Sequence, residues 1–168
     1  MILGGRIIRS VLTTGLWKCN VPVAKLTIGP NSVDVRVSED LKVQRHHGGP
    51  AFVIGEDNPS YVRAGGGETL ILRAQQLYLG STQEAFDCAE PIEVDGGMRT
   101  FVPMYEGRSS LARLGLFSHI SAGFGDYGFN APFTLEFYYI GPYDNLVIPV
   151  GTRIGQIYRV ALIPCFIY

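Results

Sequence analysis

The first periodic pattern in the chain is helical. Residues 5–14 carry four apolar side chains at the spacing of one helix face: Ile7, Ile8, Val11 and Leu12. Apolar residues at this spacing are typical of an amphipathic helix, and glycine is common just after a helix C-terminus. The pattern therefore predicts a short helix over residues 5–14 that ends at Gly15.

After this helix the hydrophobic pattern has the period of β-strands. Residues 32–37 alternate between polar side chains and valines, so the valines are expected on one face. Short apolar runs separated by glycine and proline predict further strands over residues 41–45, 51–54, 69–73, 76–80, 100–104, 132–140, 145–148 and 154–163. Residues 55–67 and 95–98 are predicted to be loops. Many short strands with one or two short helices indicate an all-β barrel or sandwich.

Length and composition favour a single domain. The 168 residues suffice for one hydrophobic core, and no linker or repeat divides them, so we expect one domain over residues 1–168. Only 17% of the residues are charged, compared with about 25% in a typical soluble domain. The low charge favours a surface partly covered by partner subunits, although aromatic-rich β domains share this composition.

Charge and cysteine content exclude several classes. A net charge of −1 without a basic stripe argues against nucleic-acid binding, whereas a small anionic ligand needs only a few arginines. Cys19, Cys88 and Cys165 are far apart and form no CxxC pair, so neither a disulfide framework nor a structural zinc site is predicted. No segment has the apolar length of a membrane span or the pattern of a secretory signal. We expect a cytoplasmic protein, in the host cytoplasm if the source is viral.

The segment GRSSLARLG combines serines, arginines and a closing glycine. It predicts a helical turn with Ser109 or Ser110 as N-cap and Gly115 at its end. An open helix N-terminus offers free N–H groups that suit phosphate, and Arg108 and Arg113 lie close to it in the sequence. Two interpretations remain open, namely a polyphosphate cradle and an ordinary capped turn with two surface arginines.

Two further features carry candidate chemistry. In GFGDYGF, glycines surround Asp126, so its carboxylate is expected to project beside a pocket; alternatively it bonds its own backbone in a hairpin loop. In the following strand, Thr134, Glu136 and Tyr138 share the face opposite the large apolar residues. Glu136 is the only charge in that strand, and it is either a paired structural acid or a catalytic base.

These motifs together resemble a known family. GRSSLARLGL, then SHISAGF, an aspartate, a short glycine-containing turn and TLEF are similar in order and spacing to the signature of the dCTP deaminases, in the dCTP deaminase/dUTPase family. The similarity extends through residues 146–156 and, near the N-terminus, residues 30–37. It is specific over residues 106–156, while residues 38–100 match in pattern only.

The resemblance implies a fold and an activity. It implies a homotrimeric, distorted β-barrel with active sites between subunits, which deaminates dCTP to dUTP. It also implies Mg²⁺ carried by the triphosphate and no zinc, which agrees with the lack of the H-x-E and P-C-x-x-C ligands of zinc deaminases. One branch of the family also hydrolyses dUTP to dUMP and pyrophosphate, and Phe124 in the Ala-Gly-Phe run is more similar to that branch.

The resemblance also implies roles for individual residues. Arg108, Ser109 and Ser110 would bind the triphosphate, with Gln156 near the phosphates. Ser109, Arg113 and Glu136 would form the deamination centre, in which Glu136 activates water and the Ala122 backbone helps to place it. Asp126 would hold the 3′-hydroxyl of the sugar and help direct water in the second step. The role-bearing residues are Arg108, Ser109, Ser110, Arg113, Ala122, Phe124, Asp126, Glu136 and Gln156.

Two departures from the family keep other functions open. Gly125 and Tyr127 flank Asp126 in place of an isoleucine and, usually, a proline, so we expect either a modified pyrimidine nucleotide as the ligand or an altered pocket. The printed chain ends at Tyr168, where family members usually continue into a tail that covers the nucleotide; residues 55–67 would substitute, or turnover is lost. The alternatives are a catalytically silent trimeric nucleotide-binding protein, regulatory or structural, and a dUTP diphosphatase.

Overall fold

The computed structural model describes residues 1–45, 60–87 and 90–162. Three predicted segments lie wholly or partly outside the described residues: the strand over residues 51–54, the first five residues of the loop over 55–67, and the last residue of the strand over 154–163. Two of the three cysteines, Cys88 and Cys165, do as well, while Cys19 is a free thiol.

The described residues form two short α-helices, one 3-10 turn and thirteen strands. The helical elements are α1 (Gly5–Thr13), η1 (Val23–Lys25) and α2 (Ser109–Ala112). The strands of the first half are β1 (Lys18–Cys19), β2 (Thr27–Ile28), β3 (Val33–Gln44), β4 (Tyr61–Arg63), β5 (Thr69–Arg73) and β6 (Leu77–Asp87). Those of the second half are β7 (Ile92–Val94), β8 (Gly97–Arg99), β9 (Phe101–Gly107), β10 (Leu116–Phe117), β11 (Asn130–Tyr139), β12 (Asn145–Pro149) and β13 (Arg153–Ala161).

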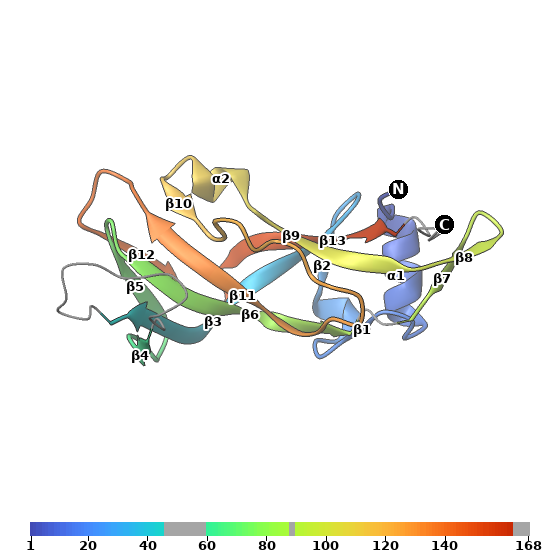
Figure 1. Cartoon of the computed structure of the whole chain (residues 1–168), viewed down its shortest axis with the longest axis horizontal. Coiled ribbons are helices and arrows are strands. Elements are labelled where there is room, and N and C mark those ends of the chain that lie inside the picture. The colour runs from blue at the N-terminus through green and yellow to red at the C-terminus, as the bar shows by residue number, and fades with distance from the viewer. Residues whose placement is uncertain (46–59, 88–89, 163–168) are drawn as a thin grey trace, which may run out of the picture.

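One large antiparallel sheet organises the fold. Its strands follow the order β10-β11-β6-β3-β13-β9, and the short strands β1, β2 and β4 pair with β6 or β3. Two separate two-stranded sheets, β5 with β12 and β7 with β8, complete the strands. Figure 1 shows an elongated molecule with α1 near one end and α2 with β10 over the other half. The sheet is nearly closed and 52% of the described residues are in strands, so the prediction of an all-β, barrel-like fold is confirmed.

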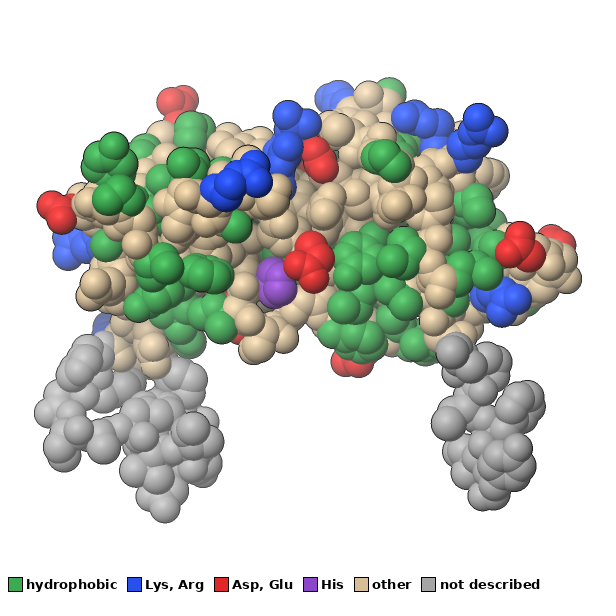
Figure 2. All heavy atoms as spheres, turned by 90° about the horizontal axis from the view of Figure 1, so that it is seen from above, with side chains coloured by type: hydrophobic (Ala, Val, Ile, Leu, Met, Phe, Trp, Pro, Cys, Tyr) green, Lys and Arg blue, Asp and Glu red, His purple; other side chains and the backbone are tan. Residues whose placement is uncertain are grey.

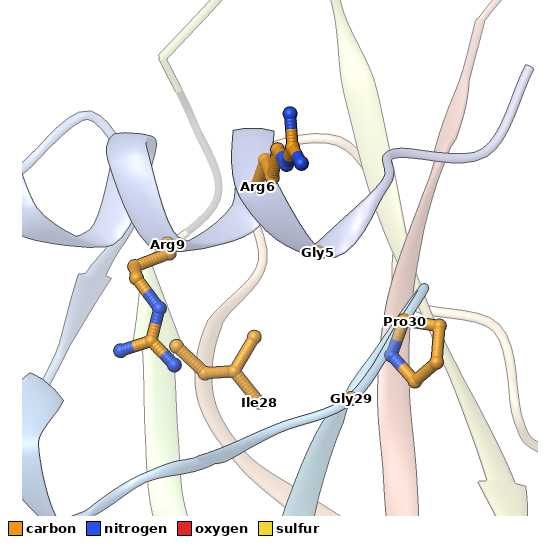
Figure 3. A pocket seen from close by; sticks show the side chains of 6 residues that line it. All are labelled: Gly5, Arg6, Arg9, Ile28, Gly29 and Pro30. Atoms are coloured by element: carbon orange, nitrogen blue, oxygen red, sulfur yellow. The ribbon is translucent and has the colours of Figure 1, made fainter.

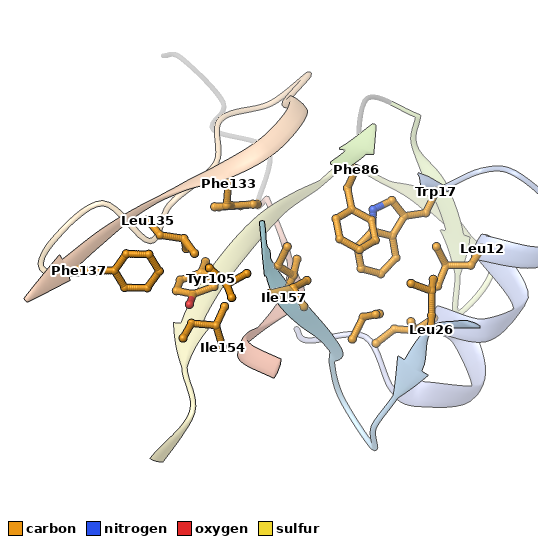
Figure 4. Close-up of a cluster of buried hydrophobic side chains, with 14 of the residues drawn as sticks. Leu12, Trp17, Leu26, Phe86, Tyr105, Phe133, Leu135, Phe137, Ile154 and Ile157 are labelled. Carbon is orange, nitrogen blue, oxygen red and sulfur yellow. The ribbon is translucent and has the colours of Figure 1, made fainter. Parts of the chain in front are cut away.

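Alternation along the long strands builds the core. Every second residue of β6 is buried, and β11 buries Phe133, Leu135, Phe137 and Tyr139 as predicted. The core extends from Phe137 and Leu135 of β11, past Ile157 of β13, to Trp17 and the α1 side chain Leu12 (Figure 4). Packing between sheet and helix therefore stabilises a helix that is too short to persist alone.

The helix agrees with its prediction except at one side chain. α1 ends at Thr13, Thr14 caps it, and Gly15 follows with a φ of 77°, which glycine adopts without strain. Ile8, Val11 and Leu12 are buried, but Ile7 is 36% exposed and lies at the edge of the apolar face. No helix among the described residues is long and apolar enough to cross a membrane.

Several strand boundaries differ from the predictions. The segments 32–37 and 41–45 belong to one strand, β3. The pairing of β3 with β6 shifts in register between Val37 and Leu41, which accounts for the break in the sequence pattern there. The loop prediction for 55–67 is wrong at β4, which pairs with the end of β3. The loop prediction for 95–98 is wrong over its second half. Asp95 and Gly96, with φ of 53° and 76°, form a two-residue hairpin turn, and β8 starts directly after it.

One buried cation lies inside the core. Arg159 of β13 is fully buried, with its guanidinium 5.5 Å from the ring centre of Trp17 and 5.6 Å from that of Phe101. Its Nη2 donates a hydrogen bond to the Phe101 carbonyl oxygen at 3.2 Å. Aromatic faces attract a desolvated cation, by about 2 kcal/mol in favourable cases. Arg159 of β13 therefore links Trp17, which packs near α1, to Phe101 of β9.

Gly155 of β13 lies against the ring of Tyr105. A Cβ at Gly155 would overlap with that ring, which is buried. We expect Gly155→Ala to lower the free energy of unfolding by about 1–3 kcal/mol, measured by denaturant unfolding. Gly97→Ala is the matched control, because no atom lies within 4 Å of a Cβ built there. Equal effects of the two substitutions would contradict the steric explanation.

Candidate functional site

The short helix α2 carries the predicted phosphate-binding residues. Arg108 is its N-cap, in extended conformation with φ −77° and ψ 129°, and its carbonyl oxygen accepts the N–H of Ala112 at 3.0 Å. Ser109 is the first helical residue, and no side chain caps the helix. The prediction that Ser109 or Ser110 is the N-cap is therefore wrong, because the chain leaves β9 extended only as far as Arg108. Both serines are exposed.

Gly115 reverses the chain after α2, as predicted. It has a φ of 86°, and a Cβ there would lie 2.6 Å from the backbone nitrogen of Gly141. Both the conformation and the close approach require glycine. The reversal leads into β10, which pairs with the end of β11 and so links α2 to the strand of Glu136.

One carboxylate holds two arginines beside α2. Asp34 Oδ2 accepts a hydrogen bond from Arg108 Nη1 at 3.3 Å and from Arg153 Nη1 at 3.1 Å. Asp34 lies on β3 opposite Gln156 of β13, and Ser32 Oγ donates to Gln156 Oε1 at 3.0 Å. Strands β3, β9 and β13 therefore bring Arg108 and Gln156, two predicted phosphate contacts, to the surroundings of Asp34.

The arginine pair leaves a local excess of positive charge. Two guanidinium groups share the single negative charge of Asp34, and each guanidinium has further N–H donors beyond the one used on Asp34. The side chains of Arg108 and Arg153 are 31% and 51% exposed, so these donors are accessible. This arrangement suits the oxygens of a polyphosphate. Arg108 is also not a free surface arginine, since Asp34 fixes its direction.

Glu136 lies on the outward face of β11, between Thr134 and Tyr138. Its Oε2 accepts two backbone N–H groups, from Ile120 at 2.9 Å and Ser121 at 3.3 Å. No hydrogen bond to Oε1 is made by any described residue. One oxygen of the carboxylate is thus fixed by the backbone, while the other is available to an external group. This is the geometry of a positioned base with a free proton acceptor.

Residues 118–124 connect Glu136 to β9. Tyr105 of β9 donates its hydroxyl to Ser118 Oγ at 2.9 Å and its backbone N–H to the Gly123 carbonyl at 2.7 Å. Burial raises the pKa of the Tyr105 phenol, so the hydroxyl stays a neutral donor. A Cβ at Gly123 would lie 2.6 Å from the Tyr105 carbonyl oxygen, so only glycine passes this close.

The turn that carries Asp126 is also anchored on β9. The N–H of Gly125 donates to the Pro103 carbonyl at 2.9 Å, and the Asp126 carbonyl accepts the N–H of Phe129 at 3.1 Å. The structure gives the Asp126 side chain no bond to its own backbone, and the residue is exposed. Phe124 next to it is 56% exposed, and so available to a ligand.

No hydrogen bond or ion pair joins Arg113 and Glu136 within the described chain. Arg113 is exposed at the C-terminal end of α2, and its side chain makes no hydrogen bond or ion pair with any described residue. Glu136 contacts only the residues 120 and 121 of its own chain through its carboxylate. Ala122 is exposed beside that contact. The predicted residues therefore divide into two clusters. The first, called the phosphate group below, consists of Arg108 and Gln156 around Asp34, and the second, called the acid group, consists of Glu136 and the residues that hold it.

An apolar hollow adjoins the acid group. It has a volume of about 470 Å³ and is lined by Leu77, Phe117, Ile120, Tyr138 and Ile140. Figure 2 shows hydrophobic side chains gathered in patches on one face of the molecule, with arginine and lysine side chains along its upper edge. The side chains of Phe117, Ile120 and Ile140 are about half exposed, at 47%, 57% and 55%, so this side of Glu136 presents an uncovered apolar surface.

Two further hollows do not include Glu136 in their lining. One, of about 300 Å³, is lined by Ser32, Gln156 and Tyr158 among others, and so belongs to the phosphate group. The other, of about 440 Å³, lies between α1 and the Gly29–Pro30 turn. Figure 3 shows that its two arginines diverge, with Arg9 directed toward Ile28 and Arg6 directed away from it. They do not converge on one ligand.

Sequence reasoning missed four residues that the fold brings into these groups. Asp34 and Arg153 join the phosphate group, and Glu106 and His119 lie beside the loop that holds Glu136, with His119 Nε2 3.3 Å from Glu106 Oε2. All four stand inside stretches that resemble the family, which was the available signal. Their contacts could not be predicted, because they depend on how distant strands and loops come together.

The structure is thus a barrel-like all-β domain that carries a turn with arginine and serine residues at α2 and, on β11, a glutamate held by backbone N–H groups. The family described as dCTP deaminase-like matches residues 2–159 of this chain. The chain is 34% identical over 151 residues to the "dCTP deaminase, dUMP-forming" of Hathewaya histolytica, covering 88% of this chain and 79% of that protein. It is 37% identical over 139 residues to the protein of the same name from Leptospira biflexa serovar Patoc, covering 82% and 70%. The chain belongs to the dCTP deaminase-like family.

A solved structure supports the fold. The crystal structure of 2′-deoxycytidine 5′-triphosphate deaminase from Agrobacterium tumefaciens superimposes with a TM-score of 0.65 at 20% sequence identity. The match covers 95% of this chain and 47% of that one. This chain thus spans about half the length of that protein, and the likeness concerns the fold alone.

Proposed function

We propose that this protein deaminates dCTP to dUTP and hydrolyses the dUTP to dUMP and pyrophosphate. The observation that carries the proposal is the Glu136 carboxylate, whose Oε2 is held by the N–H groups of Ile120 and Ser121 while Oε1 remains open. The names of the relatives support the same reaction, since both are dUMP-forming dCTP deaminases.

In the deamination step Glu136 moves protons between water and the base. Oε1 takes a proton from a water molecule while the water oxygen attacks C4 of the cytosine, and Glu136 then passes that proton to N3. The second water proton then goes to the exocyclic amino group, the C4–N4 bond breaks, and ammonia leaves. Water and dCTP thus give dUTP and ammonia. Ser109 and Arg113 would contact the reacting base, and the Ala122 backbone would help to place the water.

The cluster of residues around Asp34, the phosphate group, would bind the triphosphate of the nucleotide. Arg108, fixed by Asp34, and the exposed hydroxyls of Ser109 and Ser110 supply donors, with Gln156 nearby on β13. Among the described residues no cluster of three or more His, Cys, Asp or Glu side chains could hold a metal ion. The guanidinium and hydroxyl donors fit phosphate oxygens rather than a cation. As the family resemblance implies, Mg²⁺ would arrive bound to the triphosphate, whose charge it lowers.

The hydrolysis step would use the Asp126 turn. Asp126 is exposed, so its carboxylate is free to hold the 3′-hydroxyl of the sugar and to direct a second water at the α-phosphate. Attack of that water breaks the bond to the β-phosphate and releases dUMP and pyrophosphate. Phe124 supports this second step, because the Ala-Gly-Phe run is more similar to the branch of the family that forms dUMP. A homotrimer with sites between subunits would bring Arg113 of one chain to Glu136 of the next.

Incubation of the purified protein with dCTP and Mg²⁺, followed by chromatography of the products, tests the proposal. Appearance of dUMP with little dUTP is expected. Accumulation of dUTP would contradict the second step. Consumption of dUTP but not of dCTP would indicate a dUTP diphosphatase, and binding of both nucleotides without products would indicate a silent nucleotide-binding protein.

Arg108→Ala tests the phosphate group. We expect the KM for dCTP to rise by about one to two orders of magnitude, since a charge-assisted contact to a phosphate contributes roughly 1.5–3 kcal/mol. Steady-state kinetics gives KM and kcat, and Arg99→Ala, an exposed arginine on the β7–β8 hairpin, is the matched control. An unchanged KM for Arg108→Ala would remove Arg108 from the triphosphate site.

A further inference from the structure

We propose that Glu106 and His119 form a positioning pair that fixes the direction of the Glu136 carboxylate; the catalytic part of this inference rests on the proposed deamination. His119 immediately precedes Ile120 and Ser121, whose N–H groups hold Glu136 Oε2. Any displacement of this segment moves both donors together. The direction of Glu136 therefore depends on what holds residues 118–121 in place.

The side chain of His119 connects this segment to β9. Its Nε2 lies 3.3 Å from Glu106 Oε2, and its ring meets the ring of Tyr105 edge-on, with centroids 5.4 Å apart at 84°. A carboxylate only accepts hydrogen bonds, so Nε2 carries the hydrogen. The buried Nδ1 has no partner among the described residues, which suits a lone pair better than a second N–H.

Glu106 also connects to the phosphate group. It lies two residues before Arg108 and opposite Gln156 in the pairing of β9 with β13. The Glu106–His119 contact is thus a link between the strand that leads into the phosphate group and the segment that holds the acid group. The pair thus fixes the segment that holds Glu136 relative to β9 of its own chain.

The exposure of Glu106 and His119 indicates that their contact positions the segment rather than stabilises the fold. The Glu106 side chain is 51% exposed and that of His119 22%, and pairs near the surface contribute little to folding stability. Ser118, by contrast, is buried and bonded to Tyr105. Loss of the Glu106–His119 contact should therefore leave the melting temperature nearly unchanged while it disturbs the segment locally.

Three variants separate the contact from the packing. His119→Phe keeps a ring against Tyr105 and removes the bond, Glu106→Ala removes the bond from the other side, and Glu106→Gln keeps an oxygen that accepts it. We expect kcat for dCTP to fall by about tenfold in His119→Phe and Glu106→Ala with KM changed by less than about twofold, as for a misplaced catalytic group. Glu106→Gln should recover most of the loss seen in Glu106→Ala.

Hydrogen exchange supplies a test that needs no activity. The amides of Ile120 and Ser121 should exchange several times faster in His119→Phe and Glu106→Ala than in the wild type, read by mass spectrometry of peptides over residues 118–122. Glu93→Ala, an exposed glutamate on β7, is the control. Unchanged exchange overturns the positioning role even if the protein deaminates dCTP. Faster exchange in a protein that leaves dCTP intact supports the contact's role in the segment and contradicts only the proposed function.

Discussion

Replacing Glu136 with glutamine is expected to lower kcat for dCTP deamination by about a thousandfold, within the range for loss of a general acid–base group. Glutamine has the shape of glutamate, and its amide oxygen can still accept the N–H groups of Ile120 and Ser121. The amide nitrogen then occupies the open position of Oε1. That nitrogen cannot take a proton from water, so the chemical step fails while the surrounding segment stays in place.

The measurement compares turnover with binding. Steady-state deamination gives kcat, and calorimetric titration with dCTP gives affinity, which we expect to change by less than about fivefold because the triphosphate contacts remain. Glu93→Gln removes a glutamate charge from an exposed strand position and is the matched control. Turnover near that of the wild type in Glu136→Gln would exclude Glu136 as the base. A parallel loss of binding would instead assign Glu136 to holding the nucleotide.

Local patterns predict most of the elements of this fold. α1, β5, β11 and β12 follow from spacing and alternation, because each buries one face against the same core. The patterns fail where pairing decides the outcome. β6 continues well beyond its predicted end, because β3, β11 and β1 pair along its length. The short strand β4 exists because the end of β3 offers a partner.

The candidate site shows the same division. The outward direction of Glu136 follows from alternation alone, and the positive φ of Gly115 follows from its place after a helical turn. The partners of these residues do not follow, because they come from distant strands. Asp34 reaches Arg108 across 74 residues and Arg153 across 119. The N-cap was mistaken for a similar reason, since the extended end of β9 places Arg108, not a serine, at the start of α2.

The separation of Arg113 from Glu136 has a consequence for assembly. Each is accessible in the single chain, and an uncovered apolar hollow lies beside Glu136. A second chain packed over that hollow would bury apolar surface and supply a cation to the acid group at the same time. The proposed trimer would explain why a chain with only 17% charged residues leaves this carboxylate facing outward without a basic partner among the described residues.

Mixing two inactive variants is expected to restore activity. Arg113→Ala and Glu136→Gln should each be inactive alone as oligomers. In a mixed oligomer, a site that takes Arg113 from one chain and Glu136 from the next is intact whenever the first is the Glu136→Gln chain and the second the Arg113→Ala chain. Equal mixing in a symmetric oligomer gives about a quarter of the wild-type sites. Unfolding and refolding the two variants together, then assaying dCTP deamination, measures the recovered fraction.

A second mixture controls for the pairing of residues. Ser109→Ala and Arg113→Ala alter the same short helix, α2, so both changes affect the same side of every site. No mixture of these two chains contains an intact site, and no recovery is expected. If Arg113→Ala mixed with Glu136→Gln also stays inactive while mixed oligomers form, the two residues serve one chain's own site, and the separation seen in the single chain must close by movement of α2 rather than by assembly.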